Sequence, residues 1–105
     1  MSFIVRLIPV SIYDITQVEA YLRHMALKGY LVKKMWGNFA TFEKGTPSKK
    51  KYRLEPYAEQ GKEPPEDMQL YYEEQGWKYI CKNGYFHLYQ GTREDAMEIH
   101  TDAVI

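Results

Sequence analysis

Hydrophobic and polar residues alternate in two stretches of the chain that are near copies of each other. The first, GYLVKKMWGNFATFEKG over residues 29–45, predicts a helix end, a strand, a tight Gly-Asn turn and a second strand. The second, GWKYICKNGYFHLYQG over residues 76–91, predicts the same order around an Asn-Gly turn, the dipeptide most typical of a short β-hairpin. Each half of the chain therefore predicts a hairpin that directly follows a helix.

Matching positions in the two stretches lie 47 residues apart, and the same offset recurs upstream of the hairpins. The run RLIP at residues 6–9 returns as RLEP at residues 53–56. Several separate features in one register are typical of an internal duplication. We therefore expect two copies of a strand-helix-strand-strand unit, with the register held without a gap from the first strand to the sixth.

Helix signals fill the space between the strands of each unit. Asp14 or Thr16 can cap the first helix, and Gly29 ends it. Pro64-Pro65 is suited to the start of the second helix, and Gly76 ends it. The first helix carries an apolar stripe with i, i+3, i+4 spacing, which indicates its core-facing side: Ile15, Val18, Leu22, Met25 and Ala26.

The resulting order is βαββ-βαββ, which indicates an α+β fold with antiparallel strands and both helices on one side. One twisted sheet and two half-sheets related by a pseudo-two-fold axis both satisfy this order, and a ferredoxin-like layout fits it less well. A chain of 105 residues is expected to form a single domain. The two repeats occupy residues 3–46 and 50–92, and the tail at 93–105 is compatible with a short last strand over 97–101.

Composition narrows the class of protein without indicating an activity. The chain has one cysteine, no visible secretory leader and no apolar run near the ~20 residues that span a bilayer, so we expect a cytoplasmic protein. Its net charge of zero separates into +6 over residues 1–51 and −6 over residues 52–105. A basic nucleic-acid surface over the whole domain is therefore not expected, whereas opposite fields can steer one copy onto another.

The helix end and the first hairpin carry a recognisable signature. Tyr21-Leu22, Met25-Ala26 and Gly29-Tyr30 resemble the W-L-x-x-M-A-x-x-G-W-x-L signature of a bacterial family of unknown function. That resemblance implies no transferable catalytic residues and a setting beside PadR-type repressors, with many members carrying transmembrane helices after this domain. The doubled element order is also similar to GyrI-like regulatory domains, which bind amphipathic, often cationic molecules between two helices. The match to the unknown-function family continues in order through Phe39, Phe42, Lys44-Gly45, Tyr52-Arg53-Leu54, Gly76-Trp77, Tyr79 and Ile99-His100-Thr101-Asp102.

Few residues are suited to metal binding or catalysis. His24, His87, His100 and Cys81 are the soft ligands available, and none has a paired spacing such as C-x-x-C or H-x-x-x-H. Cys81 has no evident base, so we expect neither an enzyme nor a metal or other cofactor. Residues 37–42, GNFATF, superficially match an RNA-recognition strand. The same spacing recurs in the second repeat, where it is explained by a turn followed by core residues. Nucleic acid is therefore not an expected partner.

Carboxylates and aromatic residues gather at the end of the second helix. A carboxylate with aromatic walls is suited to a lipophilic cation, and Trp36 would add a wall from the other repeat. In the competing interpretation, Tyr72 and Trp77 belong to the core and both glutamates are solvated. The ligand-binding residues expected on the first interpretation are Trp36, Tyr71, Tyr72, Glu73, Glu74 and Trp77.

Two functions remain open from the sequence. The first is a non-enzymatic regulatory or sensing module that binds a small amphipathic or cationic ligand in an aromatic groove between the repeats. The second is a protein-interaction module that forms a homodimer or pairs with a PadR-type transcription regulator. Exposed sheet edges and the opposite charges of the two halves would mediate the second function.

Overall fold

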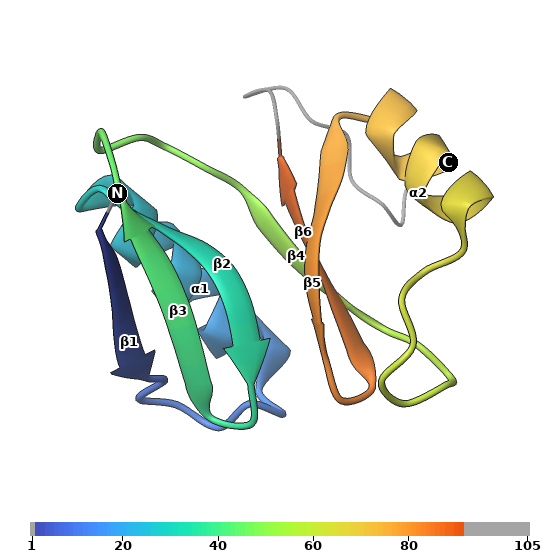
Figure 1. The fold of residues 1–105 in the computed structure, drawn as a ribbon, viewed down its shortest axis with the longest axis horizontal. Coiled ribbons are helices and arrows are strands. Elements are labelled where there is room, and N and C mark those ends of the chain that lie inside the picture. Colours follow the sequence, from blue (N-terminus) through green and yellow to red (C-terminus); the bar gives the residue numbers. More distant parts are fainter. Residues whose placement is uncertain (1, 92–105) are drawn as a thin grey trace.

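The computed structural model describes residues 2–91, which fold into two helices and six strands (Figure 1). The strand expected over 97–101 lies outside the described residues. The order of elements along the chain is the one predicted from the hydrophobic pattern. The elements are β1 (Phe3–Leu7), α1 (Ile15–Leu27), β2 (Tyr30–Trp36), β3 (Phe39–Lys44), β4 (Tyr52–Pro56), α2 (Glu66–Glu74), β5 (Trp77–Asn83) and β6 (Phe86–Gly91).

The strands form two separate three-stranded antiparallel sheets. Sheet A has the order β1-β3-β2, and sheet B has the order β4-β6-β5. The α+β class and the strand-helix-strand-strand order are therefore confirmed, and of the two arrangements left open the structure adopts two half-sheets. In each sheet the last strand of the repeat lies in the middle, so that both hairpins place their return strand against the first strand of the repeat.

The two helices do not lie on one side of a common layer. Leu54 and Leu88 of sheet B share a buried cluster with residues of α1, whereas the neighbouring Tyr89 packs edge-to-face on Tyr72 of α2, with ring centroids 4.6 Å apart. Successive side chains of a strand point to opposite faces, so α1 and α2 cover opposite faces of sheet B. Figure 1 shows the result, with sheet B between α1 and α2.

The helix end and the hairpin of the two repeats share backbone details. Gly29 and Gly76 end the two helices with the same φ of 93°. The ladder of each hairpin shifts register at the same place, between Val32 and Lys34 in sheet A and between Tyr79 and Cys81 in sheet B. All of these pairs are 47 residues apart, so the repeat extends to the irregularities of its strands.

The first strand of each repeat departs from the expected register. Leu7 pairs with Phe39, and Pro56 pairs with Phe86. Because Phe39 and Phe86 are equivalent, Leu7 corresponds to Pro56, and the offset here is 49 residues rather than 47. The RLIP and RLEP runs are therefore not structural equivalents. A shift of two residues keeps every side chain on its own face, so the hydrophobic pattern does not reveal it.

The helix boundaries follow from local chemistry. The carboxylate of Asp14 accepts a hydrogen bond from the backbone N–H of Gln17 at 3.3 Å, so Asp14 rather than Thr16 is the N-cap of α1. Pro65 is the N-cap residue of α2, which begins with the acidic residues Glu66 and Asp67. Burial differs sharply between the two helices, because α1 lies between two sheets and buries four residues, whereas no residue of α2 is fully buried.

Most of the core is a single cluster that joins the two repeats. It contains residues of α1, one face of sheet A and the α1-facing side of sheet B. A smaller cluster under α2 contains Trp77 and Tyr89, with Tyr72 and Tyr79 packed against them. The helix of the first repeat is therefore the element that holds the domain together.

Candidate functional site

A concave surface lies where the two sheets meet. Strands β2 and β5 run beside each other but belong to separate sheets. Each has its register shift at the matching position, next to Lys33 in β2 and Ile80 in β5. A bulge bends its strand and interrupts regular pairing. A cleft of about 460 Å³ lies between the two strands beside these register shifts, and we refer to it as the inter-repeat cleft.

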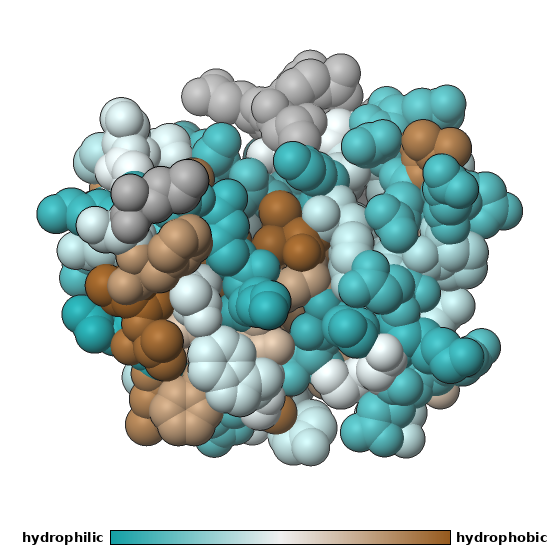
Figure 2. Space-filling view, in the orientation of Figure 1, coloured by the Kyte–Doolittle hydropathy of each residue, from teal (hydrophilic) through white to brown (hydrophobic). Residues whose placement is uncertain are grey.

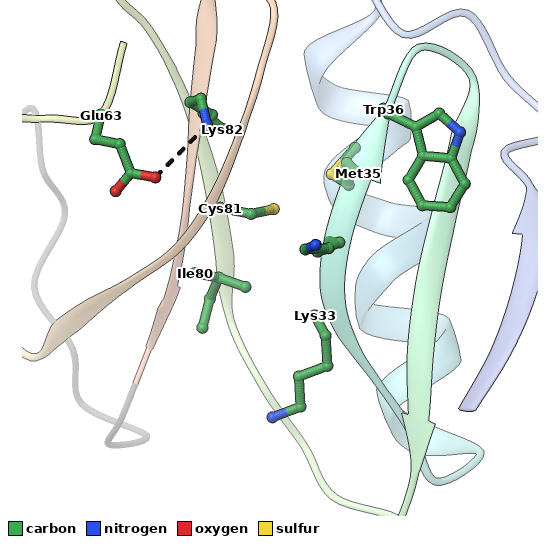
Figure 3. Close-up of a pocket in the computed structure, with 8 residues that line it drawn as sticks. Lys33, Met35, Trp36, Glu63, Ile80, Cys81 and Lys82 are labelled. Carbon is green, nitrogen blue, oxygen red and sulfur yellow. Dashed lines mark ion pairs between the residues drawn. The ribbon is translucent and has the colours of Figure 1, made fainter. Parts of the chain in front are cut away.

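The inter-repeat cleft has an apolar floor and a basic rim. Figure 3 shows the sulfur atoms of Met35 and Cys81 pointing towards each other from the two strands, with the side chain of Ile80 beside them. Met35 is only 6% exposed, so the floor is continuous with the core. The charged residues that line the cleft are Lys33, Lys34, Lys82 and Glu63.

Two of the three lysines are partly neutralised. Nζ of Lys33 lies 3.4 Å from Oε1 of Glu43, and Nζ of Lys82 lies 3.6 Å from Oε2 of Glu63 (Figure 3 shows the second pair). Lys34 forms no ion pair with any residue between 2 and 91. With three lysines against one glutamate in the lining, the cleft carries an excess of positive charge and favours a negatively charged group.

Cys81 contributes apolar surface and not reactivity to this cleft. Burial raises the pKa of its thiol to about 12, and a hydrogen bond with the backbone of Met35 offsets only part of that effect. At neutral pH the group is therefore a protonated thiol, which is a poor nucleophile. Its chemical contribution is that of a small hydrophobic side chain with a weak S–H donor.

A pair of hydrogen bonds joins the two hairpins directly after the lining residues Trp36 and Lys82. The side-chain oxygen of Asn83 accepts a hydrogen bond from the backbone N–H of Gly37, and its NH₂ group donates to the carbonyl oxygen of Gly37, both at 3.0 Å. This pair of bonds joins the turn of sheet A to the end of β5. It fixes the distance between the two strands that form the cleft walls.

The expected ligand-binding residues are not brought together. Trp36 lines the cleft, but Figure 3 shows its ring turned away from the gap and over β3, where it stacks on Phe39 with a centroid distance of 6.0 Å. Within residues 2–91, α1 and α2 make no contact, so no groove forms between the two helices. The remaining members of the set are on or directly after α2: Tyr71, Tyr72, Glu73, Glu74 and Trp77.

Those five residues have separate structural roles. Trp77 is 2% exposed and belongs to the small core cluster, and Tyr72 packs on Tyr89. Tyr71 is 57% exposed, and Glu73 and Glu74 are also exposed. The competing interpretation of these residues, as core aromatics beside solvated carboxylates, is therefore the one that the structure supports.

The lining residues of the cleft left a weak signal in the sequence. Two consecutive exposed lysines, Lys33 and Lys34, interrupt the strict alternation of β2, and the apolar pair Ile80-Cys81 interrupts that of β5. A broken alternation within a strand marks a bulge. The two breaks lie at equivalent positions of the repeats. That they face each other follows only from the placement of the two sheets side by side.

Among residues 2–91, the soft ligands singled out in the sequence are not gathered into a group that could hold a metal ion. The structure between residues 2 and 91 contains no group of three His, Cys, Asp or Glu residues that could hold a metal ion, and His100 lies outside that range. His87 is 2% exposed, and its Nε2 lies 2.7 Å from the carbonyl oxygen of Lys62. This histidine holds the loop before α2 against sheet B.

The fold and the cleft define a small, duplicated α+β domain with a cleft between its repeats. The chain belongs to the family described as a protein of unknown function (DUF2812), whose model matches residues 14–104. No curated protein and no solved structure gives a significant match to the chain. Neither helix in the described part of the chain is long and apolar enough to cross a membrane.

Proposed function

We propose that this domain is a non-enzymatic regulatory or sensing module that acts in the cytoplasm and binds a small amphipathic ligand in the inter-repeat cleft. The observation that carries the proposal is the cleft itself, with Met35, Ile80 and Cys81 as its apolar floor and three lysines at its rim. A volume of about 460 Å³ lies within the range of small-molecule sites, ~300–1,000 Å³. Both repeats contribute to its walls, so occupancy can be transmitted between them.

The charge of the rim favours an anionic head group over the cation expected from Glu73 and Glu74. Those two glutamates are exposed on α2 and outside the cleft lining, whereas Lys34 is in the lining and without an ion pair in the described chain. A carboxylate with an alkyl tail satisfies both parts of the site. Its charge would meet the lysines, and its tail would cover the apolar floor.

Methionine methyl NMR provides a test that reports on the cleft directly. Protein labelled at the methionine methyl groups would be titrated with decanoate and, in parallel, with decylammonium, which has the same chain length and the opposite charge. We expect a saturable shift of the Met35 signal with decanoate and a weaker one with decylammonium. Met68, on α2, serves as an internal reference for non-specific binding.

A pair of lysine variants separates specific charge recognition from a general effect of net charge. Lys34→Gln should weaken decanoate binding roughly tenfold, as expected for the loss of one charge-assisted contact. Lys78→Gln removes the same charge from an exposed position of β5 outside the cleft and should leave the affinity unchanged. If neither amphiphile moves Met35, or if both move Met68 equally, the ligand-binding proposal is rejected.

A second candidate function is protein interaction. Large apolar side chains are exposed on sheet A, which favours a surface that meets another protein. The resemblance to the PadR-associated family suggests a PadR-type transcription regulator as the partner to which such a module would report. A calorimetric titration with a PadR-type repressor would test that pairing, and absence of heat at micromolar concentrations would argue against it.

A further inference from the structure

One face of sheet A is apolar, and no residue between 2 and 91 covers it. On this outer face, alternate residues of β1 lie beside residues of β3 and β2, and the rows Leu7–Phe39–Trp36 and Val5–Thr41–Lys34 follow from the strand register. In Figure 2 the brown and tan atoms over β1 and β3 mark this surface. Its large apolar members are between 42% and 59% exposed: Phe3, Val5, Leu7, Trp36 and Phe39.

The equivalent face of sheet B is covered by the chain itself. Thr41 in the centre of the outer face corresponds to Leu88, which is 0% exposed, and the neighbouring Leu54 is 4% exposed. Both belong to the core cluster that contains the buried residues of α1. The same architectural face is therefore packed against protein in one repeat and left open in the other, within residues 2–91.

The size of the open face matches what a self-association needs. Three of the five large residues are aromatic, and aromatic side chains bury 150–250 Å² each, so with Val5 and Leu7 and about half exposure the face offers roughly 500 Å² per copy. Two such faces together bury about 1,000 Å², the lower bound for a specific protein interface. A patch of this size on a monomer is at the upper end of what soluble proteins expose.

The charges on this face are arranged so that it can meet a copy of itself. The two rows that contain Val5, Leu7, Phe39 and Trp36 have one charged residue, Lys34, at the β2 end of its row, and Glu43 lies on the central strand between Phe3 and Leu31. Lys33, next to them, forms an ion pair with Glu43 and remains at the edge. Two copies can therefore bring the apolar residues together with Glu43 paired to Lys33 and with the exposed Lys34 at the edge of the contact.

We propose that the outer face of sheet A is the interface of a homodimer, in which two copies pack sheet to sheet across a two-fold axis. A two-fold contact closes on itself and uses the same patch twice. The alternative head-to-tail contact would set the exposed Leu70 and Tyr71 of α2 on this face, together with the acidic Asp67 and Glu74 of the same helix stripe. That arrangement would press carboxylates against apolar side chains and would not close.

Two leucine variants distinguish the two-fold contact from the head-to-tail one. Leu7 and Leu70 are 59% and 53% exposed, and they lie on sheet A and on α2 respectively. Leu7→Lys and Leu70→Lys introduce the same charge at the two candidate surfaces. Sedimentation equilibrium over a concentration series up to about 100 μM would measure the dimer dissociation constant of each variant and of the unmodified protein.

We expect the unmodified protein to dimerise and Leu7→Lys to raise the dissociation constant on the order of a hundredfold, because each substitution is present twice in a two-fold interface. Leu70→Lys should leave the constant unchanged. Added salt should tighten the dimer, since the interface joins two halves that each carry +6. A head-to-tail contact between the basic and acidic halves would instead loosen with salt.

The proposal is overturned if the unmodified protein is monomeric throughout the series, or if Leu70→Lys weakens association as much as Leu7→Lys does. Thermal unfolding monitors whether the variants fold. If Leu7→Lys does not, Val5→Lys on the same face takes its place. As an independent readout, the emission of Trp36, which is 46% exposed, should shift to the blue as the concentration rises through the dissociation constant, and a constant spectrum would contradict burial of this face.

Discussion

Two tyrosine-to-phenylalanine substitutions should change stability in opposite directions. Tyr89 is 0% exposed, and its hydroxyl has no hydrogen-bond partner within residues 2–91. Tyr52 is equally inaccessible, at 3% exposed, but its hydroxyl donates a hydrogen bond of 2.7 Å to the side-chain oxygen of Gln90. Burial raises the pKa of both phenols, so both carry their proton at neutral pH. The same chemical change therefore removes an unsatisfied group in one case and a satisfied one in the other.

The magnitudes follow from the cost of leaving a polar group buried without a partner. An unsatisfied buried hydroxyl costs about 1–3 kcal/mol, so Tyr89→Phe should stabilise the fold by up to that amount. Its ring keeps its contacts with Tyr72 and Tyr79, whose centroids lie 4.6 and 5.8 Å away. Tyr52→Phe breaks a hydrogen bond worth about 0.5–1.5 kcal/mol and leaves the oxygen of Gln90 without its donor, so it should destabilise.

Equilibrium unfolding in urea at pH 7 measures both effects. For a small domain the slope is about 1–3 kcal/mol per molar urea, so a change of 1 kcal/mol moves the midpoint by several tenths of a molar unit. We expect the midpoint to rise for Tyr89→Phe and to fall for Tyr52→Phe with unchanged slopes. If Tyr89→Phe destabilises by 1 kcal/mol or more, its hydroxyl has a partner in the folded protein, and the reasoning is refuted.

Two further predictions concern the junction of the repeats. Gly29→Ala should destabilise the fold by more than about 2 kcal/mol, because φ is +93° and an added Cβ would lie 2.7 Å from the carbonyl oxygen of Gly45. The control, Gly61→Ala, has φ +73° and open space around the added Cβ, so it should cost only about 1 kcal/mol. Equal shifts of the unfolding temperature in the two variants would contradict this prediction. Glu19→Gln should gain stability over the unmodified protein as pH rises from 4 to 7. Burial raises the pKa of Glu19, whose carboxylate accepts a 2.8 Å hydrogen bond from the N–H of Leu54, so its stabilising contribution is complete below the ordinary pKa of 4.5 and is lost as pH rises through the shifted value. A stability difference that does not change with pH in urea titrations would show that this carboxyl has an ordinary pKa.

The duplication illustrates how far a repeat can be read from one sequence. Turn glycines and hairpin dipeptides act within a few residues, so Gly29 and Gly76 locate the helix ends correctly in both halves. The similarity of RLIP and RLEP gave a false equivalence for the first strands, because pairing with β3 and β6 sets their register and a slip of two residues preserves the facing pattern. Local signals identified the elements, and non-local pairing set their alignment.

The candidate sites show a similar division. Aromatic residues beside glutamates at the end of α2 had the composition of a cation site, yet Trp77 is buried and Glu73 and Glu74 are exposed. The local sequence shows which side chains are near each other along the chain, but not which of them face a common space. The inter-repeat cleft joins β2 to β5 across 47 residues, so it exists only because the two sheets lie edge to edge.

The sequence by itself determined the secondary structure of this protein: six strands, two helices, their order along the chain, and the duplication. The hydrophobic periods of 2 and 3.6 and the turn residues that indicate these elements are local properties of the chain. The tertiary structure alone decided which faces are covered. Strand β1 is apolar on both sides, with Ile4 turned towards the core and Phe3, Val5 and Leu7 towards the outer face. The pattern cannot choose between two apolar faces. Packing of α1 between the sheets made that choice. Among residues 2–91 it left the outer face of sheet A open, and the cleft lies between β2 and β5.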